Sequence, residues 1–186
     1  MDLKELNKPV NIDDIDFRIQ SINSNGWATI LAYKDARYDM NVLDDVVGAE
    51  NWQKDYKIIN ERLYCGVAIK CNNEWVWKWD VGTESQTEKE KGQASDAFKR
   101  SCFNWGIGRE LYEFPYIGVQ LNEAEYYLKD VGNKKIGVAK VRINDWKWHI
   151  DRENDKIIWM GCRDGNKKLR WQTGDYSKMK EKLNNG

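Results

Sequence analysis

Residues 80–112 read DVGTESQTEKEKGQASDAFKRSCFNWGIGRELY. This stretch predicts the end of a strand, then a charged helix that ends at two glycines. Small and apolar side chains recur along the helix at intervals of three and four: Ala94, Ala97, Phe98, Ser101, Cys102 and Trp105. At about 100° per residue this spacing makes one continuous face, which predicts a long amphipathic helix that buries that face. Two pairs at capping-box spacing, Ser85 with Glu88 and Thr87 with Glu90, mark its start.

Three segments before this helix have the composition of strands: 52–59, 63–70 and 74–81. The residues between them have the length of hairpin turns, so the sequence predicts an antiparallel meander. The helix that follows Gly82 is the natural cover for the apolar face of this sheet. Trp75, Trp77 and Trp79 alternate along the third strand and therefore share one face. We expect them to pack under the helix; base stacking or a contact between subunits is the alternative.

The segments on either side are predicted from weaker patterns. Residues 1–11 are polar and are expected to be a poorly ordered lead-in. Residues 13–21 fit either a strand or a short helix, 27–33 a strand, and 35–47 a helix that ends on Gly48. After Pro115 we expect a short helix over 122–130 and a second small meander over 136–143, 146–150, 157–162 and 169–172.

The expected fold is therefore α+β: an antiparallel β-meander covered by a long amphipathic helix, with a small β-rich C-terminal extension. No repeat or Gly/Ser linker divides the 186 residues. We assign residues 12–116 to the core, 117–175 to a β-rich extension of the same domain, and 176–186 to a polar tail.

Composition restricts the function. Thirty basic and thirty acidic residues give a net charge of zero, which argues against a uniformly basic nucleic-acid binder but leaves room for a local basic groove. Ten Trp, nine Tyr and four Phe are many for this length, so some are expected to be exposed at a recognition surface or a subunit interface. No apolar run of membrane-spanning length is present, and a cytoplasmic location is expected.

Residues for catalysis, cofactors or metals are sparse. The four cysteines and the single His149 lack the spacing of a zinc site, and reduced thiols are expected. No phosphate-binding loop is present, so no nucleotide cofactor is predicted. Asp2, Asp55 and Asp145 each begin an Asp-x-Lys tripeptide, which keeps a metal-dependent nuclease open as an alternative. We otherwise expect no enzymatic activity.

Lys99 and Arg100 lie on the helix side opposite Ala94 and Trp105, among outward residues that are mostly acidic or amide. The simplest interpretation is a core helix with a solvated charged side. The alternative is that both cations contact phosphates.

The same stretch resembles the annealing domain of the Rad fifty-two family, and most closely its short bacteriophage members, the Sak-type single-strand annealing proteins. The residues that carry this resemblance are Asp80, Gly82, Asp96, Lys99, Arg100, Trp105, Gly106 and Gly108. In that family the lysine–arginine pair lines the inner DNA groove, which implies this role for Lys99 and Arg100. Arg18 lies near the groove arginine of the family, and Lys70 and Lys91 correspond to an outer site for a second strand.

The resemblance implies a recombination and repair protein that binds single-stranded DNA and anneals it without ATP, as a homo-oligomeric ring or helical filament. It implies no membrane partner, and the host cytoplasm as the location if the protein is phage-encoded. The alternative in the same class is a sequence-tolerant single-stranded DNA-binding module without annealing activity.

Overall fold

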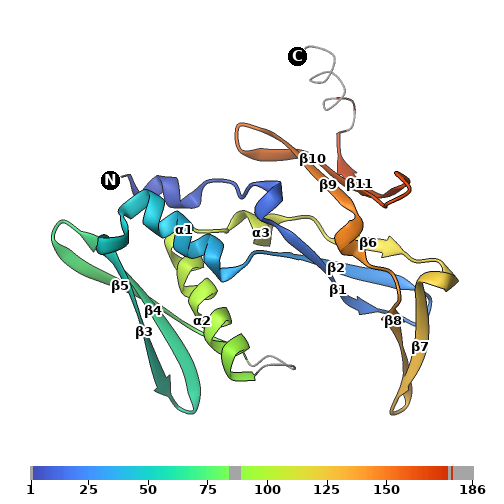
Figure 1. The fold of residues 1–186 in the computed structure, drawn as a ribbon, viewed down its shortest axis with the longest axis horizontal. Coiled ribbons are helices and arrows are strands. Elements are labelled where there is room, and N and C mark those ends of the chain that lie inside the picture. The colour runs from blue at the N-terminus through green and yellow to red at the C-terminus, as the bar shows by residue number, and fades with distance from the viewer. Residues whose placement is uncertain (1, 84–88, 176, 178–186) are drawn as a thin grey trace. The chain divides into compact units, whose positions relative to one another are not determined.

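The computed structural model describes residues 2–83, 89–175 and 177, and divides the chain into two units (Figure 1). The first comprises Met1–Val10 and Lys34–Tyr112, and the second Asn11–Tyr33 and Glu113–Gly186. Every strand pair in the described ranges is antiparallel, and helices accompany the strands. The predicted α+β class is thus confirmed. None of the described helices is both long and apolar enough to cross a membrane.

In chain order the first unit contains η1 (Leu3–Asn7), α1 (Ala36–Val47), η3 (Ala49–Asn51), β3 (Trp52–Ile59), β4 (Arg62–Cys71), β5 (Glu74–Val81), α2 (Lys89–Trp105) and the start of α3 (Glu110–Glu113); the η elements are 3-10 helices. The sheet order is β3–β4–β5. Both hairpins turn over two residues with positive φ, Asn60 with Glu61 and Asn72 with Asn73. Left-handed backbone at both positions matches the twist of the flanking strands.

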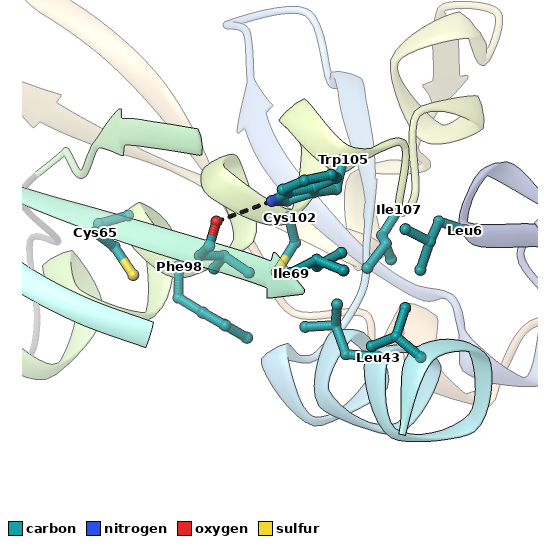
Figure 2. Packing of buried hydrophobic residues seen from close by; sticks show 11 residues of the cluster. Leu6, Leu43, Cys65, Ile69, Phe98, Cys102, Trp105 and Ile107 are labelled. Carbon is teal, nitrogen blue, oxygen red and sulfur yellow. Dashed lines mark hydrogen bonds between the residues drawn. The ribbon is translucent and has the colours of Figure 1, made fainter. Parts of the chain in front are cut away.

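Helix α2 packs its small and apolar face on β4 (Figure 2). Ala97, Phe98 and Cys102 are essentially inaccessible to solvent, together with Cys65, Val67 and Ile69 of β4. The Trp105 indole Nε1 donates a hydrogen bond of 2.9 Å to the Val67 carbonyl, and the Ser101 hydroxyl donates to the Cys65 carbonyl. These two bonds satisfy polar groups that the helix would otherwise bury without partners.

Helix α1 and the N-terminal residues complete this core. The Asp35 carboxylate caps α1 by accepting from the Arg37 amide at 2.8 Å, and Leu43 and Val47 face the cluster. The prediction of a poorly ordered lead-in is wrong, because η1 places Leu6 in the core at 1% exposure and Val10 is fully buried. Leu3 also packs against this core, so apolar contacts hold the polar segment in place.

The second unit contains, in order, η2 (Ile12–Asp14), β1 (Asp16–Ile22), β2 (Trp27–Tyr33), β6 (Ile117–Gln120), η4 (Glu123–Glu125), β7 (Tyr126–Val131), β8 (Lys134–Ala139), η5 (Ile143–Asp145), β9 (Lys147–Glu153), β10 (Lys156–Arg163) and β11 (Leu169–Gly174). They form the sheets β1–β2–β6 and β9–β10–β11 and the hairpin β7–β8. The open choice at residues 13–21 is resolved as a strand that follows one 3-10 turn.

The helix predicted over 122–130 is wrong. Asn122 and Glu125 do form a reciprocal capping box, but the helical turn that it starts ends at once. Tyr126 and Tyr127 follow, and such residues favour an extended strand. The resulting strand, β7, pairs with β8. We expected β8 to join a meander with residues 146–172, but it belongs to a separate hairpin.

A partly buried ion cluster ties η4 to β11. The Arg170 guanidinium, 7% exposed, donates to both oxygens of Glu125 at 2.7 and 2.9 Å and to Asp164 at 3.3 Å. Its hydrogen bonds lower the pKa of the Glu125 carboxyl. The Trp146 ring lies 4.6 Å from the same guanidinium, so the buried charge is matched by both carboxylates and an aromatic face.

Candidate nucleic-acid interface

The end of β5 is fastened to α2 by residues of the stretch that begins at Asp80. Thr83 donates two hydrogen bonds of 2.9 Å to the Asp96 carboxylate, from its amide and from its hydroxyl. Gly82 lies so close to α2 that a Cβ atom there would meet the Gln93 carbonyl oxygen and the Ala97 Cβ. Asp96 and Gly82 therefore have a structural role in this motif, and the Asp96 charge is engaged by Thr83.

Arg100 extends from α2 toward β5. Its Nε donates to the Asp80 carboxylate at 3.2 Å, while 40% of the Arg100 side chain stays exposed. The other Asp80 oxygen lies 3.4 Å from the Asn104 side-chain nitrogen. A guanidinium has five N–H donors, and the four on the Nη atoms make no bond to other described residues. Asp80 thus fixes the orientation of Arg100, and among the described residues its forked end has no further partner.

Lys99 extends to the other side of α2, toward the start of α1. Hydrogen bonds from Arg37 lower the pKa of Asp35, and the charge of Lys99 contributes to the same shift. Lys99 is half-buried and has no ion pair with a carboxylate of the described residues. The two predicted cations are therefore adjacent in sequence but lie on different flanks of the helix.

A buried ion pair lies beneath the start of α1. Lys34 contacts Asp39, and both side chains are almost inaccessible. Burial raises the pKa of Asp39 to about 6, against the opposing attraction of Lys34. Gly108 packs on the Lys34 stem, where a Cβ atom would collide with the Lys34 Cε. The glycine at this position in the helix exit is thus explained by contact with a charged side chain.

The expectation that Trp75, Trp77 and Trp79 pack under α2 is wrong. In the sheet register Lys78 is opposite Val67, and Val67 is buried beneath α2. Residues paired across a sheet share a face, so the alternating tryptophans lie on the opposite face. Alternation alone identified three residues on one side of the strand but not which side the helix would cover.

We call this side the tryptophan face: Trp75, Trp77, Trp79, Lys57 and Lys70. Trp79 lies over Gly66 and stacks on Trp77 with ring centroids 5.4 Å apart. The Lys57 ammonium is 4.4 Å from the Trp79 ring centroid, and Lys70 is paired with Trp75 across the strands. The face combines exposed rings with these two cations and with Asp55, whose carboxylate lies 3.9 Å from the Lys57 ammonium. Of the two cations, only Lys70 was expected, as part of an outer site for a second strand.

Several cations of the first unit were missed. The Lys78 ammonium donates to the Asn104 carbonyl at 2.8 Å and lies 4.2 Å from the Trp105 ring. Arg109 donates to the Phe103 and Asn104 carbonyls at 2.9 and 3.0 Å. These two residues satisfy the carbonyls at the C-terminus of α2, so they stabilise the helix. The available signal for Lys78 was its position two residues before Asp80, which puts both side chains on the same face of the strand.

Arg18 belongs to the second unit, where it is exposed on β1 with its guanidinium 5.3 Å from the Tyr33 ring. The same side of that sheet carries Trp27 and Tyr116, which are 41% and 63% exposed. The Tyr116 hydroxyl bonds to the Thr29 hydroxyl at 2.8 Å and accepts from the Trp27 indole at 3.1 Å. Both bonds lower the pKa of Tyr116.

Lys91 is in α2, but its side chain lies outside the described residues, as do the predicted capping pairs Ser85 with Glu88 and Thr87 with Glu90. The nuclease alternative rests on three aspartates that belong to separate elements. Asp2 caps η1, Asp55 lies in β3, and Asp145 lies in η5. In the ranges that the structure describes, no group of three His, Cys, Asp or Glu side chains is placed to hold a metal ion.

The sequence is similar to a known protein family and to a bacterial DNA-binding protein. The sequence model of the family described as Rad52/22 family double-strand break repair protein matches residues 3–127. The chain is also similar to the single-stranded DNA-binding protein DdrA of Deinococcus radiodurans, with 29% identity over 115 residues. This similarity covers 60% of the chain and 55% of DdrA, so the chain spans about half the length of that relative.

Proposed function

Because the chain belongs to the Rad52/22 family of double-strand break repair proteins, we propose that it binds single-stranded DNA and anneals complementary strands. The observation that carries this proposal is the Arg100 guanidinium, which Asp80 orients at the end of the sheet and whose Nη donors bond to no other described residue, with Lys99 on another flank of α2. A forked donor of fixed orientation suits a phosphate, which accepts two parallel hydrogen bonds.

The mechanism depends on which part of the DNA strand the protein binds. Arg100 and Lys99 contact phosphates, so the bases remain available for pairing with an incoming strand. Base pairing then supplies the free energy for annealing, and neither ATP nor a catalytic residue is needed. Arg18 adds a cation in the second unit, and Lys70 and Lys91 serve a second strand. The family model over residues 3–127 supports placing this activity in a core of residues 12–116, where α2 covers the meander.

One alternative has support of its own. DdrA is described as a single-stranded DNA-binding protein, so binding alone, with protection of the strand and no annealing, is the second candidate. The two activities separate in an assay with two complementary labelled oligonucleotides, because only an annealing protein accelerates duplex formation above the spontaneous rate.

We place the protein among the short Sak-type bacteriophage members and propose that it acts as a homo-oligomeric ring or helical filament. Many nucleotides must be held in one regular conformation for pairing to be tested along a strand, and one small subunit cannot hold them. The exposed tryptophan face supports contact with either bases or a neighbouring subunit.

The test replaces both cations, Lys99→Ala with Arg100→Ala. Both side chains are partly exposed, and loss of the Arg100–Asp80 pair is expected to cost only about 0–1 kcal/mol of stability. Binding to an unstructured single strand and the annealing rate should fall at least tenfold. The matched control is Lys156→Ala with Lys168→Ala, two exposed lysines of the second unit, which should leave both quantities within twofold.

A folded, assembled double variant that binds and anneals like the parent would show that α2 is a core helix only. A single change, Arg100→Lys, refines the assignment because it keeps the charge and removes the fork. Affinity retained by Arg100→Lys would mean that charge alone suffices at this position.

A further inference from the structure

The hairpin β7–β8 is a local concentration of positive charge in a chain of zero net charge. Residues 126–140 contain four lysines, Lys129, Lys134, Lys135 and Lys140, and one acidic residue, Asp130. All four lysines are exposed. None of them forms an ion pair with a carboxylate in the part of the chain that the structure describes. Most of the hairpin lies beyond residues 3–127, which match the family.

The two faces of the hairpin differ. One face is anchored to β1, because Ile22 packs where a Cβ of Gly137 would lie. The other face is open, and the register places on it Tyr127, Lys129, Val131, Lys134 and Ile136. Tyr127, Val131 and Ile136 are 47%, 50% and 42% exposed, and the Lys140 ammonium lies 5.9 Å from the Tyr127 ring. We call this side the open face; it carries cations and no carboxylate.

We propose that the open face of the β7–β8 hairpin binds duplex DNA. A ribbon of two strands about 4.8 Å apart fits a major groove about 12 Å wide. Lysines on the ribbon then reach phosphates at the groove walls, and the apolar side chains between them face base edges and thymine methyl groups. In the second unit of Figure 1 the turn of the hairpin points away from β9–β11, while β8 contacts β1 on the anchored face.

A single strand suits this face less well. Binding of single strands depends on bases stacking on bare rings. Tyr127 is the one aromatic side chain that the register puts on the open face, and the Lys140 ammonium is near its ring. The site therefore goes beyond the proposed function, in which α2 holds a single strand: it would hold the duplex that annealing produces.

The experiment compares two triple variants of the full chain. Lys129→Gln, Lys134→Gln and Lys140→Gln remove the cations of the open face, whereas Lys147→Gln, Lys156→Gln and Lys168→Gln remove three exposed lysines of β9–β11 and its turn. Binding to a blunt-ended duplex and to a non-pairing single strand of equal length is measured by fluorescence anisotropy over a series of salt concentrations.

For the hairpin variant we expect at least tenfold weaker duplex binding and single-strand affinity within twofold of the parent. If each lysine contacts one phosphate, the slope of log K against log salt for duplex becomes shallower by about 2.7. Lys135→Gln, on the anchored face, should change little although it adjoins Lys134.

Duplex affinity equal to that of the control triple would overturn the inference. So would an equal loss for single and double strands, which would assign the hairpin to the single-strand site. A change in oligomer size by light scattering would assign it to a contact between copies of the chain. Failure of the parent to anneal, with selective loss of duplex binding in the hairpin variant, would leave this inference standing and refute the proposed function alone.

Discussion

Gly82 shows how one residue can join a strand to a helix. A Cβ there would meet the Gln93 carbonyl oxygen and lie 2.9 Å from the Ala97 Cβ. The helix backbone cannot retract without disturbing its contact with β4. We expect Gly82→Ala to lower the free energy of unfolding by about 1–3 kcal/mol, measured by urea denaturation.

The control for Gly82 is Gly165→Ala, where an added Cβ has no neighbour within 4 Å. It should alter stability by no more than about 0.5 kcal/mol. Equal effects of the two substitutions would contradict the close contact between the end of β5 and α2.

Asp39 predicts a pH dependence of stability. Burial raises the pKa of its carboxyl to about 6, above its unfolded value, so the folded state binds the proton more tightly. The stabilisation this gives is full below about pH 4 and is lost as the pH rises through 6. Asp39→Asn does not titrate. Its unfolding free energy relative to the parent should therefore increase between pH 4 and 7, by up to about 3 kcal/mol.

Urea unfolding of both proteins across that pH range measures this difference. A constant difference would mean that Asp39 keeps an ordinary pKa beside Lys34.

At the scale of elements, the two flanks and the buried face of α2 have separate roles. Ala97 is fully buried against β4, so Ala97→Asp places an unpaired carboxylate in the core. We expect this substitution to unfold the protein, so that no cooperative thermal unfolding transition is observed. This result should not depend on whether the protein binds DNA. A stable, assembled Ala97→Asp protein would contradict the burial of this residue between α2 and the sheet.

For α2 and β5, the periodicity of the sequence predicted the helix and the strand but not which side of the strand packs against the helix. The buried residues of α2 were identified from spacing, because a 3.6-residue period has one meaning once the helix is assumed. The side of β5 that α2 covers was assigned wrongly, since period two defines two faces but not which one meets the helix. The sequence also suggested Lys99 and Arg100 as candidate DNA contacts without predicting that they extend to different flanks of α2, because that difference depends on Asp80 and on the start of α1.

Two predictions were wrong for different reasons: the poorly ordered lead-in that contains Leu6, and the helix over residues 122–130. Leu6 is a single apolar residue in a polar segment, and its burial depends on partners distant in sequence. In the second case the segment does begin with a capping box and one helical turn, and pairing with a neighbouring strand prevailed after it. Tertiary contacts decided both outcomes, and local propensity is a weak guide where they do.

At the scale of the molecule, we predict self-association. Trp75 and Trp77 are 40% and 36% exposed, and β3 and β5 are unpaired at their outer edges in the described chain. Open edges and exposed aromatic faces favour contact with another copy. Light scattering should give a mass several times that of one chain; a clean monomer with and without DNA would refute the ring or filament.

The zero net charge leads to a second prediction at this scale. Binding must rest on a few local cations, so affinity for a single strand should fall with salt at a slope of about −0.7 for each phosphate neutralised. Removal of Lys99 and Arg100 should make the slope shallower by about 1.4 per subunit contact. Affinity that does not respond to salt would exclude phosphate contacts as its source.

The order of the chain through the two units also constrains how the protein can be dissected. The backbone passes from one unit to the other after Val10, after Tyr33 and after Tyr112, so each unit is assembled from two separate lengths of chain. No single cut releases either unit whole. During synthesis the β1–β2 hairpin must wait for β6, because Thr29 pairs with Gly118, and residues 34–112 of the first unit emerge in the interval. A fragment that ends at Tyr112 would therefore keep an unpaired β2 edge, and separate expression of the units calls for a circularly permuted or rejoined chain.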